Sequence, residues 1–253
     1  MTIPLLGRSR PPRRVRPGPD AMTLAEHLGE LRRRLVISVV AFVAGGVVAA
    51  VFYGWFLRLL QHPYCTVNPH DCLFYVTGPL DPLALRLKMA AFGGLVLASP
   101  IILWQIWRFI TPGLRPNEKR YAVPFVCCSV LLFLGGCATA YAVFPHALRF
   151  LVDVGGPQLH ELLNPNSYLS LILLMMALFG LTFEFPVVLV ALELAGVVTP
   201  AKLLHWWRWA VIGITLAAAV FTPSSDPFSM LALAVPLVAF YFSAIGIGKL
   251  LGR

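Results

Sequence analysis

Long apolar runs separated by short polar segments make up most of this chain. Four of the runs are long enough to cross the roughly 30 Å hydrocarbon core of a bilayer as helices, which takes about 20 residues. A fifth run has only about 13 residues and crosses only if the bilayer thins or if the helix also uses its tryptophan-rich flank. We therefore predict six transmembrane helices, at Leu35–Phe56, Met89–Ile110, Tyr121–Phe144, Tyr168–Ala195, Trp209–Phe221 and Phe228–Gly248.

Prolines interrupt four of these runs, at Pro100, Pro124, Pro186 and Pro236. Proline removes a backbone hydrogen bond and kinks a helix, so several bent helices favour a curved wall over a straight bundle. The predicted fold class is an all-α polytopic membrane protein whose six helices, several of them kinked, form a curved cup.

Composition agrees with a membrane location. The chain is 58% hydrophobic and 12% charged, whereas a soluble domain has roughly 25% charged residues. The prediction is one membrane domain at residues 22–253, preceded by a disordered tail at residues 1–21 that is rich in Pro, Gly and Arg. The pair Arg13–Arg14 does not indicate a targeting signal, because prolines rather than a short apolar region follow it.

Positive charge predicts the orientation of the helices. All but four of the 20 Lys and Arg residues lie on one side of the predicted helices, and the exceptions are Arg58, Arg86, Lys88 and Arg149. Both termini are therefore predicted to be cytoplasmic. The net charge of +9 fits anionic lipid at the inner surface rather than nucleic acid, since the basic residues border the helices and form no single stripe.

Two outer loops, Leu57–Lys88 and Pro145–Asn166, are too long for simple turns. We predict that they fold over the outer mouth of the helices as a cap, with a solvated linker as the alternative. The first loop contains Cys65 and Cys72, a candidate disulfide on the oxidising side. The nearby histidines complete no recognised ligand spacing, so no metal site is predicted.

The segment HLGELRRRL, His27–Leu35, precedes the first apolar run. Its leucines recur at helical spacing, which predicts an amphipathic helix lying on the inner surface. Glu30 and Arg34 are four residues apart and form a favourable pair on such a helix. The second inner loop also has one acid among bases, Glu118. Because carboxylates bind guanidinium groups through paired, charge-assisted hydrogen bonds, Glu30 and Glu118 could together receive two adjacent arginines; ordinary surface anchoring is the alternative.

One acid lies deep inside an apolar run. Glu184 falls about 24 Å along the helix that begins at Tyr168, where an ionisable group costs several kcal/mol unless it is paired, protonated or in contact with water. Its carboxyl group either bonds a neighbouring hydroxyl such as that of Thr182, relays protons or contacts a passing chain. A further acid, Asp226, lies in the turn TPSSDP, where it is expected to start the last helix.

Motifs of catalysis are missing from the sequence. There is no phosphate-binding GxxxxGK[ST] loop, HExxH, GxSxG or CxxC, so we predict no enzyme activity, cofactor or metal. A small-molecule or ion secondary transporter is the alternative function, although such proteins usually have an internal repeat and broken helices, and no repeat is evident. A purely structural membrane scaffold is a third candidate.

Several blocks in order resemble the TatC family, the multispanning receptor subunit of the twin-arginine protein translocase. They are HLGELRRRL, ASPIILWQIWRFITPGL, EKRYAVPF, FGLTFEFPVVL and FTPSSDPFSMLALAVP, and the resemblance runs from about Thr23 to Gly248. It implies a Sec-independent translocase subunit of the bacterial inner membrane that recognises twin-arginine signal peptides and nucleates the complex exporting folded proteins. The implied partners are small single-span TatA-like and TatB-like subunits, further copies of the chain and the lipid membrane, and the implied energy source is the proton-motive force.

The resemblance also assigns roles to residues. It implies that the signal arginines bind a surface formed by Glu30, Glu118, Arg32, Leu35, Phe109, Pro112, Lys119 and Arg120. Glu184 matches an intramembrane polar position of the family, while Thr222, Asp226 and Met230 match its last outer turn and partner-docking face. Two departures weaken the docking match: Phe242 follows Tyr241 where family members commonly have Glu, and Met230 stands where they often have Gln.

Overall fold

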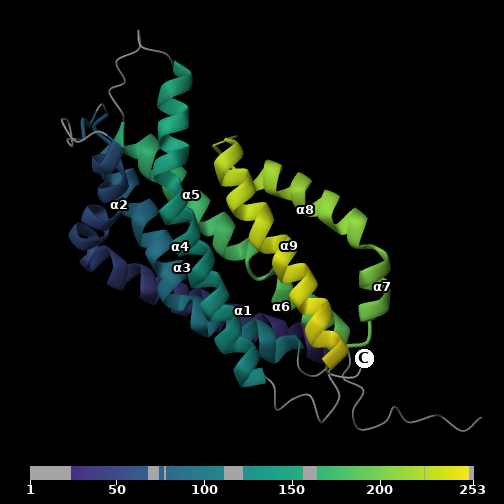
Figure 1. Ribbon diagram of the computed structural model, residues 1–253. Helices are drawn as coiled ribbons and strands as arrows, with labels where there is room; N and C mark the ends of the chain where they lie inside the picture. The colour runs from purple at the N-terminus through teal and green to yellow at the C-terminus, as the bar shows by residue number, and fades with distance from the viewer. Residues whose placement is uncertain are drawn as a thin grey trace, which may run out of the picture.

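The computed structural model describes residues 24–67, 74–76, 78–110, 122–155, 164–224 and 226–250. All regular secondary structure in these residues is helical, which confirms the predicted all-α class. The helices are α1 (Leu24–Val51), α2 (Tyr53–Val67), α3 (Asp81–Ile110), α4 (Ala122–Gly155), α5 (Pro165–Thr182), α6 (Phe185–Leu194), α7 (Pro200–His205), α8 (Trp207–Phe221) and α9 (Pro227–Leu250) (Figure 1).

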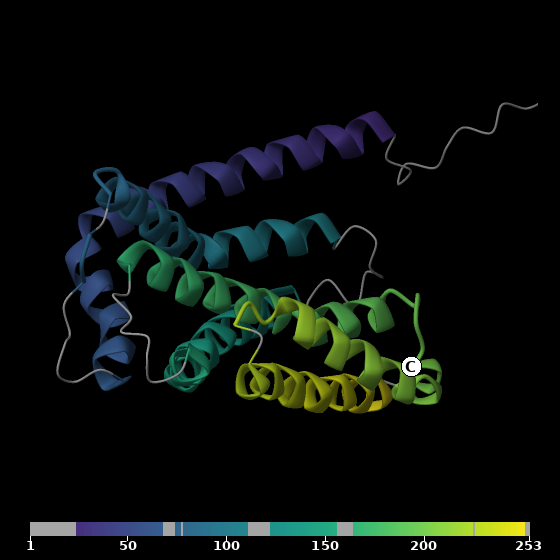
Figure 2. The ribbon, with the colours of Figure 1, turned by 90° about the horizontal axis from the view of Figure 1, so that it is seen from above.

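The helices follow one another in space as a wall with two edges. The long helix α1 packs on α3, α3 packs on α4 and α5, α9 packs on α4 and α6, and α8 packs on α9. Figure 2 shows α1 along one edge and α9 along the opposite edge, with α3 and α5 between them. Aromatic and aliphatic side chains of α2, α4 and α5 form one end of the core, around Phe144 and Tyr168.

Glycines allow α1 and α3 to approach closely. A Cβ atom on Gly94 of α3 would lie 2.8 Å from the backbone nitrogen of Gly46 and 2.8 Å from the carbonyl oxygen of Phe42, both in α1. A Cβ atom on Gly93 would lie 2.5 Å from the Cβ atom of Ala49. Small residues of this kind let membrane helices pack backbone against backbone. The two helices run antiparallel, so the first turns of α1 come to lie beside the end of α3 (Figure 2).

The predicted surface helix at His27–Leu35 is not a separate element. It forms the first part of α1, which continues without a break to Val51, so the first membrane helix also begins and ends earlier than predicted. The physical reason is local: Leu, Glu and Arg favour helix, and no proline or turn sequence separates this segment from the apolar run.

The predicted helix at Tyr168–Ala195 is interrupted. It consists of α5 and α6, which together form one apolar stretch long enough to span a membrane. Pro186 has no N–H group to donate to the Thr182 carbonyl, and the N–H of Glu184 donates to the carbonyl of Leu181, three residues back. The helix therefore tightens and breaks at the residue before Phe185, placing Glu184 at the junction.

The other three prolines predicted to kink helices lie at different positions within their helices. Pro100 and Pro236 lie inside the continuous helices α3 and α9. Pro124 falls in the first turn of α4, where its missing N–H group would have had no helical partner. It is therefore wrong to count Pro124 as an interruption of a membrane helix.

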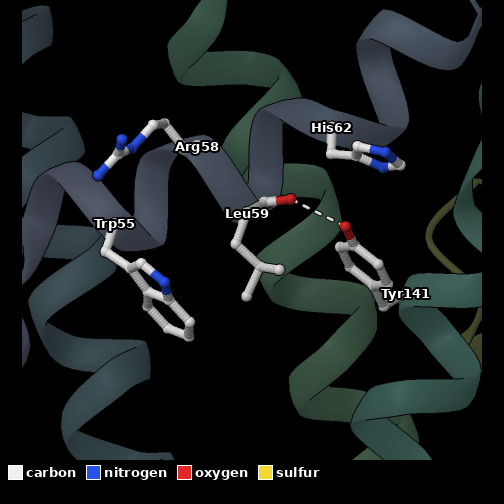
Figure 3. A pocket seen from close by; sticks show the side chains of 5 residues that line it. All are labelled: Trp55, Arg58, Leu59, His62 and Tyr141. Atoms are coloured by element: carbon white, nitrogen blue, oxygen red, sulfur yellow. Dashed lines mark hydrogen bonds between the residues drawn. The ribbon is translucent and has the colours of Figure 1, made fainter.

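The two predicted outer loops contain more helix than expected. The helix α2 occupies the start of the first loop and buries Leu60, Pro63 and Tyr64, and the hydroxyl of Tyr141 in α4 donates to the Leu59 carbonyl of α2 over 2.9 Å (Figure 3). The second loop is shorter than predicted, because α4 continues through Pro145 to Gly155. Cys65 is disulfide-bonded, but its predicted partner Cys72 lies outside the described residues, so the pairing stays a prediction.

Five helical segments in the described residues are long and apolar enough to cross a membrane, and α8 is a shorter apolar helix. The helix α8 begins at Trp207 and has 15 residues, about 22 Å of length. Its crossing, and with it the count of six, stays a prediction. The exposed Trp206, Trp207 and Trp209 at its start suit the membrane–water boundary.

Candidate functional site

The predicted inner-face site contains a small polar pocket between α1 and α3. The pocket has a volume of about 140 Å³ and is lined by Glu30, Arg33, Arg34, Ile37, Gln105 and Arg108. The glycine contact between the two helices explains this juxtaposition, since it fixes the start of α1 against the end of α3.

Glu30 binds a guanidinium group within this pocket. The Nε and Nη2 atoms of Arg34 both donate to Oε1 of Glu30, the Nε atom over 3.1 Å. The pair predicted from the spacing of Glu30 and Arg34 is therefore confirmed. The side chains of Glu30 and Arg34 are 24% and 12% exposed, and the Oε2 atom of Glu30 is buried.

Other predicted members of the inner-face surface have different surroundings. Arg32 and Leu35 are exposed on α1, and Phe109 is half-buried at the end of α3. The second acid and its neighbours, Pro112, Glu118, Lys119 and Arg120, lie outside the described residues. The convergence of Glu30 and Glu118 therefore stays a prediction.

Sequence reasoning missed Gln105 and Arg108. They occur three residues apart at the end of α3, on the same helical face, next to the loop that contains Glu118. Their spacing was a usable signal, but only the contact with α1 shows that they share a pocket with Glu30.

The intramembrane acid Glu184 belongs to a row of hydrogen-bonded polar side chains that connects α3, α4 and the α5–α6 junction. The indole Nε1 atom of Trp107 in α3 donates to the hydroxyl of Ser129 in α4 over 3.2 Å. Ser129 in turn hydrogen-bonds the side chain of Glu184. Ser129 and Trp107 are both buried, and neither was predicted as a site residue. These hydrogen bonds link the α5–α6 junction to α3 and α4, and they stabilise the carboxyl group of Glu184 within the wall.

The hydroxyl bonded to Glu184 is that of Ser129 and not that of Thr182, which the sequence suggested as an example of a partner. The hydroxyl of Thr182 donates to the Leu178 carbonyl over 2.6 Å, one turn back along its own helix. One carboxyl oxygen of Glu184, Oε1, is buried and has no hydrogen-bond partner in the described ranges of the chain. Glu184 also lines a hollow of about 370 Å³ that reaches Phe221 of α8. Glu184 is thus bonded to Ser129 inside the wall, and its side chain also borders this hollow.

The turn between α8 and α9, predicted to be an outer turn, is built around Asp226, which is 1% exposed. Its Oδ1 atom accepts from the backbone N–H of Ser229 over 2.7 Å, and its Oδ2 atom accepts from the hydroxyl of Ser224. This is the predicted cap at the start of the last helix. The hydroxyl of Thr222 is also satisfied internally, by the Ala218 carbonyl over 2.6 Å. Met230 is half-buried one turn further along α9.

Comparison with known proteins gives one consistent result. The family model described as "Sec-independent protein translocase protein (TatC)" matches residues 26–236. The chain is 41% identical to the Sec-independent protein translocase protein TatC of Frankia casuarinae, over 95% of this chain and 70% of that protein. It is 37% identical to the protein of the same name from Aquifex aeolicus, over 92% of this chain and 97% of that protein.

Solved structures agree with the sequence comparison. A crystal structure described as the twin-arginine translocase receptor TatC in DDM superposes with a TM-score of 0.75 at 36% identity, covering 88% of this chain and 99% of that chain. A second crystal structure of a twin-arginine translocase receptor TatC gives a TM-score of 0.74, covering 90% and 100%. These similarities extend over nearly all of the helical wall.

Proposed function

Because this chain belongs to the TatC family of Sec-independent protein translocase proteins, we propose that it is the subunit that receives twin-arginine signal peptides and assembles the complex exporting folded proteins. It is a multipass membrane protein with several apolar helices. The relatives favour this function over a small-molecule or ion transporter, since they carry the name of a protein translocase.

The observation that carries the proposal is the bond between Glu30 and a guanidinium group. The carboxyl group of Glu30 already accepts two N–H donors of Arg34, the chemistry with which it would bind an arginine of a signal peptide. An ion pair between residues four apart on a helix contributes only about 0.3–0.5 kcal/mol, so an incoming arginine can share or replace Arg34. Glu118 would supply the second carboxylate, with Arg32, Leu35, Phe109, Pro112, Lys119 and Arg120 forming the surrounding surface.

We place the chain in the cytoplasmic membrane with both termini inside, on the basis of its charge distribution. The partners we propose are single-span TatA-like and TatB-like subunits, and the docking face would be the α8–α9 hairpin with Met230. Thr222 and Asp226 support that face indirectly, since both side chains are buried and bonded within the turn. The protein acts as a translocase component rather than as an enzyme.

The experiment that tests the proposal compares two peptides. Purified protein in nanodiscs should bind a twin-arginine signal peptide about tenfold more tightly than its Lys-Lys counterpart, because only guanidinium groups form bidentate bonds with carboxylates. Fluorescence anisotropy with labelled peptides measures both affinities. Equal affinities, both alone and with co-expressed partner subunits, would overturn the proposal.

A second prediction concerns Glu184. We expect Glu184→Gln to reduce export of a twin-arginine precursor at least about tenfold while changing signal-peptide affinity less than twofold. The amide keeps the shape and the bond to Ser129 but cannot carry charge or a proton. Transport into inverted vesicles and peptide binding are measured on the same preparations. Parallel losses in both assays would instead indicate a structural role, and Val188→Leu at the same hollow is a control for packing.

A further inference from the structure

The pocket between α1 and α3 has an excess of positive charge. Among the residues that the structure describes, three arginines and one glutamate line it, and these four have a formal charge of +2. Arg33 and Arg108 are exposed at its rim, whereas Arg34 is 12% exposed. Glu30 can receive a guanidinium group, but the arginines around it outnumber this one carboxylate, so the side of the pocket at Arg33 and Arg108 favours an anion.

Arg34 has a buried donor atom in addition to those bonded to Glu30. Its Nε and Nη2 atoms bond Glu30, but its Nη1 atom is buried and has no hydrogen-bond partner among the described residues. A buried, charged N–H group without an acceptor is unfavourable. An anion with several oxygens could accept from Nη1 and from the guanidinium groups of Arg33 and Arg108 together, and phosphate has the matching geometry.

The position of the pocket along α1 indicates where that phosphate comes from. Ile37 lines the pocket, and from Val36 onward α1 has an apolar exposed side that includes Val40, Val43 and Val47. The arginines therefore stand where the helix passes from charged to apolar residues, which is the level of lipid headgroups. A phospholipid could place its phosphate in the pocket and its acyl chains along these valines.

We propose that the α1–α3 pocket is a binding site for an anionic phospholipid, whose phosphate contacts Arg33, Arg34 and Arg108. Gln105 contributes a side-chain amide to the same headgroup. The net charge of the pocket selects an anionic headgroup over a zwitterionic one. Binding of the lipid does not depend on recognition of a signal peptide, so the two proposals can fail separately.

The test measures lipid binding directly. The full chain in a mild non-ionic detergent is titrated with phosphatidylglycerol or with phosphatidylcholine of the same acyl chains, and bound lipids are counted by native mass spectrometry. We expect the first phosphatidylglycerol to bind about tenfold more tightly than phosphatidylcholine. The double variant Arg33→Gln/Arg108→Gln should lose that preference, and since both side chains are exposed its thermal midpoint should not change.

A matched variant tests whether the loss of two positive charges elsewhere on the protein has the same effect on lipid binding. Arg58→Gln/Arg149→Gln removes the same charge from exposed arginines outside the pocket and should bind phosphatidylglycerol as the unmodified chain does. Equal losses in the two double variants, or no preference for phosphatidylglycerol, would overturn the proposal. Displacement of the lipid by a millimolar excess of inorganic phosphate would show a site for free phosphate and would overturn the lipid assignment.

Discussion

Gly136→Ala should lower the thermal midpoint of the protein by about 5–10 °C, which corresponds to roughly 2–3 kcal/mol. A Cβ atom on Gly136 in α4 would lie 2.5 Å from the carbonyl oxygen of Phe179 and 2.8 Å from the Cα atom of Gly180 in α5. Both are backbone atoms, so no side-chain rotation relieves the overlap and the two helices must separate. Thermal unfolding in detergent, followed by loss of the monodisperse species, measures the effect.

The adjacent residue provides a matched control. Gly135 precedes Gly136 in the same helix, and a Cβ atom there meets nothing within 4 Å. Because Ala is favoured over Gly in a helix by about 0.5–1 kcal/mol, Gly135→Ala should leave the midpoint unchanged or raise it. If the two variants behave alike, the close contact between α4 and α5 is not what stabilises this part of the wall.

The double variant Glu30→Ala/Glu118→Ala should bind a twin-arginine signal peptide about 100-fold more weakly, and each single variant about tenfold more weakly. The basis is the roughly 1.5–3 kcal/mol of a hydrogen bond to a charged group, reduced because Glu30 is partly exposed. Preference for arginine over lysine should disappear in the double variant. Peptide binding in nanodiscs measures both quantities, and unchanged affinity in the single and double variants would remove these acids from the site.

A control variant separates the loss of an acceptor from the loss of an ion pair. Arg34→Gln also breaks the bond to Glu30 but leaves the carboxyl group available. If Glu30 acts by receiving the signal arginine, this variant should bind the peptide at least as tightly as the unmodified chain. A loss equal to that of Glu30→Ala would mean that the pair matters for the local structure of α1 rather than for recognition.

Local patterns predicted those features that depend on neighbouring residues. The all-α class, the apolar helices, the Glu30–Arg34 pair and the cap by Asp226 all follow from spacings of a few residues, and all are present. The same patterns misplaced helix ends. The helix α4 continues through Pro145 and α1 includes the charged segment before the apolar run, because hydropathy marks where lipid begins and not where backbone hydrogen bonding stops.

The hydrogen-bond partner of Glu184, in contrast, could not be predicted from neighbouring residues. Its sequence neighbour Thr182 was the natural partner in a single helix, but that hydroxyl bonds its own helix. The actual partner, Ser129, is 55 positions earlier in the chain and belongs to another helix. Without the packing of α4 against the α5–α6 junction, nothing in the local sequence distinguishes Ser129 from other small residues of an apolar run.

The sequence by itself determined that this chain is a helical membrane protein, how its charge is distributed, and which acids stand out against their surroundings. Those properties arise from residue hydropathy and helical periodicity, which act locally. Only the tertiary structure decided that Gln105 and Arg108 share a pocket with Glu30 and that the Nη1 atom of Arg34 has no acceptor in the part of the chain that the structure describes. The reason is that close contacts at glycines bring α1 and α3 together. Which residues of the two helices then meet is not encoded in any periodic pattern of the sequence.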